Sequence, residues 1–424
     1  MIRFLFKGVI RDRSRSLLPV IIVALGVFLT VFMNGFFQGV IGDMLDMTAR
    51  YNSGHVKILT RAYADNADQA PLDLALLGIE EMKEQLSEEY PDYEWVSRIR
   101  AGGLLDVPDE NGETRGQGPA VCSAVDLLSP ESTEAERLNI ENSLVKGSLP
   151  SIAGEALISD DFAEKFSVAI GDEVTLFGST MNGSMMFHTF TVSGTIKFGN
   201  VLLDRGAIYM DLKDAQLAFD MEDGASEILG FHREHPYNDE AAAILAEGYN
   251  EKFSDPDDEF SPLMIRLTED AGMAGYFSIA DNLVAILSLI FIIAMSIVLW
   301  NTGLLGGLRR YSEFGVRLAL GEAKKHIYRT TLLEAIFIGL IGSLIGTALG
   351  LALTYRLQTH GWDFSALTGN IGMMIPSVFR AEVTPALYGV GFIPGVIATV
   401  LGSALAGYAI YKRDTARLFQ ELEV

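Results

Sequence analysis

Four stretches of the sequence are each long and apolar enough to cross a lipid bilayer. A spanning helix needs about 20 mostly apolar residues, and the first stretch, LLPVIIVALGVFLTVFMNGFFQGVI, exceeds that length. It is too long for a removable signal peptide and lacks a small-residue cleavage site, so we expect a retained anchor. The chain is therefore predicted to be a membrane protein with four transmembrane helices, at 17–43, 279–301, 332–355 and 385–411.

Charge is distributed unevenly between the segments outside these spans. The 424-residue chain has a formal net charge of −23 although 49% of its residues are hydrophobic. Residues 44–280 contain 16 basic and 44 acidic residues, whereas 14 basic residues lie in 1–16, 303–331 and 412–424. Because Lys and Arg are retained on the cytoplasmic side, we predict a multi-pass protein of the bacterial inner membrane with both termini cytoplasmic. The acidic exterior argues against nucleic acid as a partner.

The predicted organisation is one span, a large exterior domain, and three further spans. Residues 1–16 are expected to form a cytoplasmic amphipathic N-terminus, although simple retention of positive charge inside explains the same basic residues. The remaining predicted parts, in chain order, are span 17–43, an extracytoplasmic α+β domain on a helical stalk (44–278), span 279–301, a cytoplasmic segment (302–331), span 332–355, a short extracytoplasmic loop (356–384), span 385–411 and a cytoplasmic tail (412–424).

The exterior domain mixes strand and helix patterns. Short β-branched or alternating runs bounded by Gly, Asp or Asn predict strands, and longer runs with helical spacing predict helices. The first span is predicted to continue as a helix over 42–52, and a second helix is predicted over 263–282; together they are expected to form the stalk. Cys122 is the one cysteine of the sequence, so no intrachain disulfide is possible and a core position is expected. The predicted strands are 55–59, 155–159, 172–178, 188–196 and 206–212, and the predicted helices are 160–168 and 239–253.

The sequence contains no recognisable catalytic or nucleotide-binding motif. It has no G-x-x-x-x-G-K-[ST] phosphate loop and no G-x-S-x-G elbow. The tetrapeptide from His232 to His235 differs from H-E-x-x-H, and a solvated loop explains it better than zinc. We therefore expect no enzyme activity, cofactor or metal site in this chain.

Two features of the spans are candidate contact sites. Small residues at four-residue spacing allow close helix packing in lipid, which predicts that Gly342, Gly346 and Gly350 pack either within the chain or, less favoured, at a dimer seam. The second feature lies at the end of the first span. Its Met and Phe side chains beside polar amides are expected either to face a lipid-like substrate or to form an interfacial belt; they are Met33, Phe36 and Phe37.

The basic segment SEFGVRLALGEAKKHIYRTTLLEA, at 312–335, lies between two predicted spans. Gly321 is expected to divide it into a short helix, 311–320, and a helix that runs from Glu322 into the third span. Glu313 and Arg317 are four residues apart, which predicts a supporting ion pair. An apolar face is also predicted on helical spacing, with the members Val316, Leu320, Ala323 and Ile327.

This segment, continued as IFIGLIGSLIGTALG, resembles the FtsX/MacB-type permeases of ATP-binding-cassette (ABC) systems. The stretch VKGSLPSIAGEALISDDFAEKFSVAIGDEVTLFG, followed by FTVSGTIKFG, is similar to the exterior core of that family. Within the family, MNGFFQGV and GHVKI are most similar to the lipoprotein-releasing LolC/LolE branch. The C-terminal tail lacks the proline-containing patch common in the family, and the sequence has no fused nucleotide-binding domain of the kind MacB carries.

The resemblance implies a permease dimer, of identical or different chains, bound to two cytoplasmic ATPase subunits that hold ATP and Mg²⁺. It implies mechanotransmission, in which ATP hydrolysis moves the exterior domain, with membrane lipid and a periplasmic adaptor or carrier protein as further partners. Lipoprotein release is the expected function; FtsX-like control of a cell-wall hydrolase and MacB-like efflux are the alternatives. The helix seated in the ATPase is expected to carry Glu313, Phe314, Arg317, Leu320 and Gly321.

Overall fold

The computed structural model describes residues 13–109, 111–197, 206–235, 237–308, 311–363 and 378–412. They separate into two compact units, which we call the helical unit and the sheet unit. The helical unit comprises the described residues of Met1–Asp43, Ile279–Asp363 and Val378–Val424, and the sheet unit comprises those of Met44–Ser278. Residues 1–12 of the predicted N-terminal amphipathic segment and residues 413–424 of the predicted tail lie outside the described residues.

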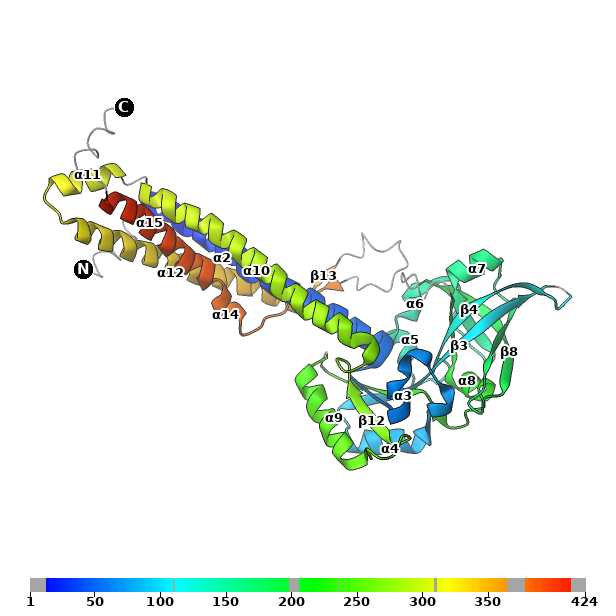
Figure 1. The fold of residues 1–424 in the computed structure, drawn as a ribbon. Helices are drawn as coiled ribbons and strands as arrows, with labels where there is room; N and C mark the ends of the chain where they lie inside the picture. Colours follow the sequence, from blue (N-terminus) through cyan, green and yellow to red (C-terminus); the bar gives the residue numbers. More distant parts are fainter. Residues whose placement is uncertain are drawn as a thin grey trace. The chain divides into compact units, whose positions relative to one another are not determined.

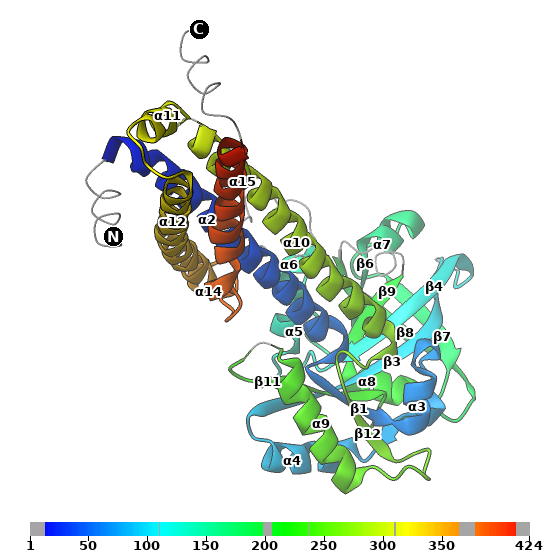
Figure 2. The same ribbon diagram turned by 60° about the vertical axis from the view of Figure 1, so that its left-hand side comes forward.

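The helical unit contains four helices that are long and apolar enough to cross a membrane, as predicted (Figure 1). Three are continuous: α2 (Arg13–Thr48), α10 (Ala271–Leu308) and α12 (Lys324–His360). The fourth consists of α14 (Leu387–Val390), a π-helical turn (Ile393–Ala398) and α15 (Thr399–Lys412). Figure 2 shows these helices as a bundle, and its core is built from Val23, Val27, Val31, Leu299, Ile338 and Leu387.

The sheet unit is built on a ten-stranded mixed sheet whose strand order is β12-β1-β11-β3-β4-β9-β6-β8-β5, with β7 paired to both β3 and β8. The β7 pairings close β3, β4, β9, β6, β8 and β7 into a barrel, while β11, β1 and β12 extend β3 as an open sheet. The strand bounds are β1 Val56–Thr60, β3 Tyr93–Pro108, β4 Thr114–Val125, β5 Leu144–Gly147, β6 Glu155–Ser159, β7 Glu173–Ser179, β8 Met185–Ile196, β9 Ala207–Asp211, β11 Glu227–His232 and β12 Pro262–Arg266.

Short helices surround this sheet (Figure 1). A continuous apolar core fills the barrel and extends under the open sheet, with Leu105, Phe162 and Phe190 fully buried. A two-stranded pair, β2 (Leu76–Leu77) and β10 (Gly224–Ala225), lies apart from the main sheet. The helices are α3 Arg61–Asp65, α4 Ile79–Glu89, α5 Glu134–Arg137, α6 Ile140–Ser143, α7 Asp160–Phe166, α8 Leu212–Ala218 and α9 Asp239–Phe253.

Most of the local predictions for this unit are confirmed. The five predicted strands correspond to β1, β6, β7, β8 and β9, and the two predicted helices correspond to α7 and α9. Cys122 is buried on β4, as expected, and burial raises the pKa of its thiol to about 12. Ser159 caps α7 and Asn238 caps α9 with side-chain hydrogen bonds, which explains why both helices begin where the sequence predicted.

The predicted stalk helix over 263–282 is wrong in its first part. Pro262–Arg266 forms β12, an edge strand paired along its whole length with β1, and α10 begins only at Ala271. The apolar run Leu263-Met264-Ile265 fits either a helix or a strand, and pairing with β1 provides partners for its backbone groups. The predicted helical continuation of the first span over 42–52 is confirmed: α2 continues to Thr48 and ends in a π-helical turn, Ala49–Ser53.

The tetrapeptide from His232 to His235 begins at the end of a strand, and its last three residues form an exposed turn, in agreement with the predicted solvated loop. His232 ends β11, and its Nδ1 accepts hydrogen bonds from the backbone N–H groups of Glu234 and His235, at 3.2 and 3.1 Å. The ring therefore closes the turn that follows the strand. Among the described residues, no three His, Cys, Asp or Glu side chains come together in a way that would hold a metal ion.

Candidate functional site

The basic segment between the second and third apolar helices forms two helices separated by Gly321. Here α11 spans Tyr311–Ala319, and α12 begins at Lys324. Gly321 has a φ of +86°, a conformation that glycine adopts without a steric penalty. Its N–H donates to the carbonyl of Leu318, and the N–H of Glu322 donates to the carbonyl of Arg317, at 3.0 and 3.1 Å. These two bonds form the Schellman motif that ends many helices.

An ion pair that the sequence did not predict spans this helix end. Arg317 donates two hydrogen bonds to Glu322, from Nε at 2.6 Å and from Nη2 at 2.7 Å. These bonds hold the pKa of the Glu322 carboxyl below its usual value. The predicted partner, Glu313, has a side chain outside those that the structure describes. Arg317 therefore fastens α11 to the residues that lead into α12.

The apolar face of this segment also differs from the predicted stripe. Phe314 and Ile327, each 4% exposed, pack together with Leu318 and join α11 to α12. Val316 is 55% exposed and Leu320 is 82% exposed. The left-handed turn at Gly321 interrupts the helical period, so positions on the two sides of it do not share one face. As a result, two large apolar side chains, Val316 on α11 and Leu320 directly after it, are left uncovered in this chain.

The three glycines of α12 lie against α2 of the same chain. A Cβ atom added to Gly342 would lie 2.6 Å from Cγ1 of Val23, and one added to Gly346 would lie 2.4 Å from the carbonyl oxygen of Ala24. At Gly350 the added atom would lie 2.9 Å from Val31. Cβ atoms in proteins do not approach other atoms so closely. Because glycine has no Cβ atom, α2 and α12 can pack at this short distance.

The candidate substrate-facing residues of α2 belong to a ladder of aromatic rings. Phe28, Phe32 and Phe36 follow one another at centroid distances of 6.2 and 6.0 Å, and Phe37 lies 6.5 Å from Phe36. Met33, Phe36 and Phe37 are half-buried. Phe28 and Phe32 are stacked, and the rings of Phe36 and Phe37 are tilted against their neighbours, so α2 carries a row of packed aromatic side chains near the end of the predicted span.

A neighbouring face of α2 is covered by residues Arg380–Thr384, which we call the strap. The N–H of Glu382 donates to the carbonyl of Gly35 at 2.9 Å, and the N–H of Arg380 donates to Asp43 at 2.8 Å. A Cβ atom on Gly39 would lie 2.2 Å from the carbonyl oxygen of Arg380. The glycines in MNGFFQGV therefore make room for the strap, a role that the sequence prediction for this motif did not include.

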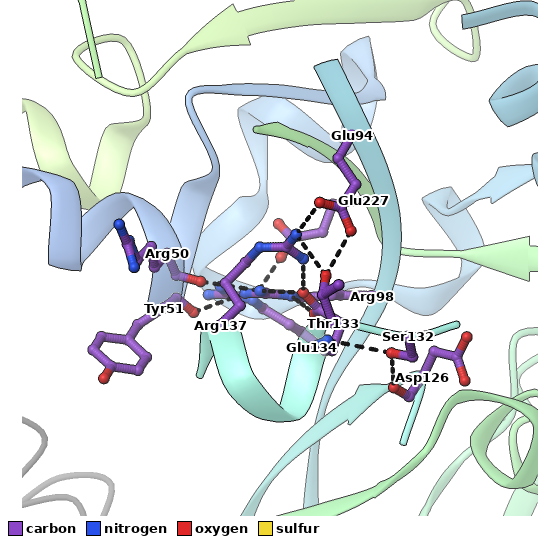
Figure 3. Close-up of polar contacts among 11 residues, drawn as sticks. Arg50, Tyr51, Glu94, Arg98, Asp126, Ser132, Thr133, Glu134, Arg137 and Glu227 are labelled. Carbon is purple, nitrogen blue, oxygen red and sulfur yellow. Dashed lines mark hydrogen bonds and ion pairs between the residues drawn. The ribbon is translucent and has the colours of Figure 1, made fainter. Parts of the chain in front are cut away.

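A buried charge cluster in the sheet unit was not predicted. Arg98, on β3, donates to the carbonyls of Arg50 and Tyr51 in the π-helical turn that ends α2, both at 3.0 Å (Figure 3). It also binds both carboxylate oxygens of Glu134, at 2.7 and 3.2 Å. Arg137 bridges Glu134 and Glu94, with its Nη2 2.8 Å from Oε2 of Glu94. No local pattern reveals this cluster, because it joins three segments that are far apart in sequence, around residues 50, 94–98 and 134–137.

A second set of buried charges lies beside the first. Lys57 on β1 contacts Glu227 at 3.0 Å and Asp270 at 2.7 Å, and Arg100 on β3 contacts Glu227 at 2.8 Å. Ser53 donates a hydrogen bond to Asp270. Burial opposes ionisation of Glu227 and Asp270, but the adjacent cations hold the pKa of both carboxyl groups below their usual values. Asp270 directly precedes α10, so this set holds the chain where that helix begins.

Comparison with known sequences matches the two parts of the chain to two family descriptions. Residues 285–415 match the FtsX-like permease C-terminal family. Residues 16–243, more than half of the chain, match the MacB-like periplasmic core domain family.

The curated relatives that the chain matches include proteins named MacB. The chain is 22% identical over 357 residues to "Macrolide export ATP-binding/permease protein MacB" of Chromobacterium violaceum, a match that covers 76% of this chain and 52% of that protein. It is 25% identical over 252 residues to the MacB protein of Burkholderia cenocepacia, covering 58% of this chain and 32% of that protein. The chain thus spans about half or less of the length of these relatives.

Among solved structures, the periplasmic region of MacB from Actinobacillus actinomycetemcomitans is similar, with a TM-score of 0.34 and 12% identity. That match covers 52% of this chain and 91% of the other.

Proposed function

Because the chain belongs to the family of permeases that join a MacB-like periplasmic core domain to an FtsX-like C-terminal region, we propose that it is the membrane subunit of an ABC system. ATP hydrolysis by a separate partner ATPase moves the helices, and the helices move the sheet unit. Two ATPase subunits bind a dimer of permease chains, on the cytoplasmic side of the inner membrane.

The observation that carries this proposal is the exposed apolar surface of α11. Val316 and Leu320 are uncovered although each is large and apolar, and such side chains mark a contact site when they lie together on a rigid element. Rigidity comes from the Phe314–Ile327 contact, the Schellman motif at Gly321 and the Arg317–Glu322 pair. We therefore assign α11 as the helix that docks into the ATPase, with Leu320 as its anchor.

The substrate we propose is a lipoprotein released from the inner membrane. Each acyl CH₂ group contributes about 0.8 kcal/mol of membrane anchoring, so two or three chains hold a lipoprotein by on the order of tens of kcal/mol, and release needs an energy source. The aromatic ladder of α2, with Met33 beside it, supplies an apolar surface suited to acyl chains. Efflux of a macrolide-like molecule is the second candidate, because the curated relatives are named for macrolide export.

Substitutions in α11 test the docking assignment. Leu320→Asp and Arg317→Glu are expected to abolish stimulation of the co-purifying ATPase while membrane insertion is unchanged. Leu217→Asp on α8 is a matched control, since Leu217 is also largely exposed, but in the sheet unit. Wild-type ATPase stimulation in both α11 variants would refute the assignment.

Photo-crosslinking from Phe36 and Phe37 tests the substrate. A photoreactive amino acid at either position is expected to capture acylated protein from inner membranes. Adducts that carry no acyl group and that a macrolide competes away would support efflux in place of lipoprotein release.

A further inference from the structure

Strand β3 changes its partner at its midpoint. Residues Tyr93 to Arg98 pair with β11, and the pairing with β4 begins at Ile99, opposite Ala124. The first half of β3 therefore belongs to the open sheet and the second half to the barrel. β3 is thus the strand that runs from one half of the sheet unit into the other, over an apolar core that both halves share, and Arg98 lies at the crossing.

Arg98 joins three elements at this midpoint. Its side chain is almost fully buried, and so is that of Glu134. The carbonyl groups at the C-terminal end of a helix carry partial negative charge, so the guanidinium is attracted to the end of α2 as well as to Glu134. The planar guanidinium donates in fixed directions, which sets the angle between the end of α2, strand β3 and helix α5 (Figure 3).

Arg100 extends the same network to the start of α10. Two residues after Arg98 on the same strand, it lies on the same side of β3 and contacts Glu227 of β11. Glu227 contacts Lys57 of β1, and Lys57 contacts Asp270, the residue before α10. The end of α2 and the start of α10 are therefore both fastened to the strand at which the open sheet meets the barrel.

We infer that a network of charged side chains forms a joint that converts movement of α2 and α10 into a change of angle between the open sheet and the barrel. Its members are Lys57, Arg98, Glu134, Glu227 and Asp270, which are largely buried, and Arg100, which is 32% exposed. This inference rests on the proposed function, in which the helices move. Buried ion pairs contribute little net stability because desolvation offsets their attraction. Directional bonds nevertheless hold one geometry where apolar packing would tolerate several, and a joint that transmits movement requires this property.

The test replaces the charged contact at α2 with an apolar one of similar size. Arg98→Met combined with Glu134→Leu removes the bonds to the carbonyls of Arg50 and Tyr51. Both charges of the Arg98–Glu134 pair are removed together, so neither is left without the other. Spin labels at Glu84→Cys, on α4 under the open sheet, and Met185→Cys, on the barrel strand β8, report the distance between the halves. Cys122 is buried, so labelling is directed to the introduced cysteines.

The labelled full chain is measured in complex with its ATPase, with and without a non-hydrolysable ATP analogue. We expect a nucleotide-dependent change in label distance in the parent and a clearly smaller change, or none, in the double variant. Binding of the ATPase and its hydrolysis rate are expected to stay at parent levels. Lys252→Gln with Glu89→Gln, which removes an exposed ion pair of the same unit, is the control and should respond as the parent does.

Each outcome is decisive. An equal nucleotide response in parent and double variant would overturn the joint and leave the proposed function standing. A parent without any nucleotide response, although its ATPase is bound and active, would overturn both. If the double variant does not fold, Arg98→Lys is measured in its place. Lysine keeps the charge but cannot make the four bonds at once, so the same loss of the nucleotide response is expected. A full response in Arg98→Lys would overturn the joint.

Discussion

Arg317 and Glu322 form a two-bond ion pair across the glycine that ends α11, with N–O distances of 2.6 and 2.7 Å. Both side chains are partly exposed, at 39% and 27%. An exposed pair of this kind stabilises a structure by only about 0.2–1 kcal/mol. Its effect is therefore expected on the orientation of α11 more than on overall stability.

The first prediction exchanges the two charges. Arg317→Glu alone is expected to impair ATPase stimulation strongly, whereas Arg317→Glu with Glu322→Arg rebuilds the pair and is expected to recover most of it. Stimulated ATP hydrolysis in the reconstituted complex is the measurement, analysed as a double-mutant cycle. Failure of the exchanged pair to recover any activity would mean that Arg317 acts through the partner ATPase and not through Glu322.

The second prediction concerns helix packing. Gly346→Ala places a Cβ atom 2.4 Å from the carbonyl oxygen of Ala24, so α2 and α12 must separate, and a loss of about 1–3 kcal/mol is expected from overpacking. Gly389→Ala is the control, because nothing lies within 4 Å of that position. Thermal unfolding of the full chain in detergent should show a lower midpoint for Gly346→Ala only; equal midpoints would contradict the packing.

The third prediction concerns the strap. Gly39→Ala pushes a Cβ atom against the backbone of Arg380 and Ala381, whereas Gly42→Ala, on the same helix, meets nothing closer than 3.7 Å. Amide hydrogen exchange at Arg380 and Glu382 is expected to accelerate in the first variant and not in the second, because local opening of these bonds becomes easier. Protection that stays unchanged in Gly39→Ala would show that the strap does not depend on this glycine.

The fourth prediction concerns acid stability of the sheet unit. Glu227 and Asp270 have pKa values below their usual 4.5 and 3.8 in the folded protein. Their contribution to stability is therefore complete above those values and is lost as pH falls through the lower, folded-state values. We expect the unfolding midpoint of the full chain to be nearly constant from neutral pH down to about pH 5 and to fall steeply below pH 4.

A matched variant identifies the source of this acid sensitivity. Glu227→Gln leaves Lys57 and Arg100 without their shared carboxylate, so a loss of about 3–5 kcal/mol at neutral pH is expected. The difference from the parent should shrink in acid, where the parent carboxylate is itself protonated. A difference that does not depend on pH would contradict this account.

The fifth prediction concerns the thiol of Cys122. Burial raises its pKa to about 12, and the thiolate is the reactive form. A maleimide reagent should therefore leave the folded wild-type chain unlabelled near neutral pH and label it after denaturation. Met185→Cys is the positive control, since Met185 is 83% exposed; rapid labelling of the folded wild type would contradict the buried position.

Local sequence patterns predicted the elements whose signals lie within a few residues. The capped helix α9 and the alternating strand β8 were predicted, because a cap or an alternation is complete within the element itself. The edge strand β12 was mistaken for a helix, since the pairing with β1 that makes it a strand involves residues about 200 positions away. The hydrophobic pattern within a short segment contains no information about a strand partner so distant in sequence.

In the candidate site, too, features with a local signal were predicted and contacts that depend on the tertiary structure were not. Gly321 and the helix it ends were predicted, because a glycine between two helical patterns is a local signal. The partner of Arg317, the exposure of Leu320 and the packing of Phe314 on Ile327 were not, because they depend on how the chain turns at that glycine. In the sheet unit, Arg98 with Glu134 and Lys57 with Asp270 have no sequence signal at all.

Hydrophobicity alone therefore established four membrane-length helices and an acidic domain between the first two, because transfer of apolar and charged groups between water and lipid depends on composition over a short window. Folding in three dimensions established which side chains meet. The barrel closes because β7 pairs with both β3 and β8, and charged side chains brought together from separate parts of the chain link the end of α2 and the start of α10 to β3. Such contacts are properties of pairs of distant residues, and no single stretch of sequence contains them.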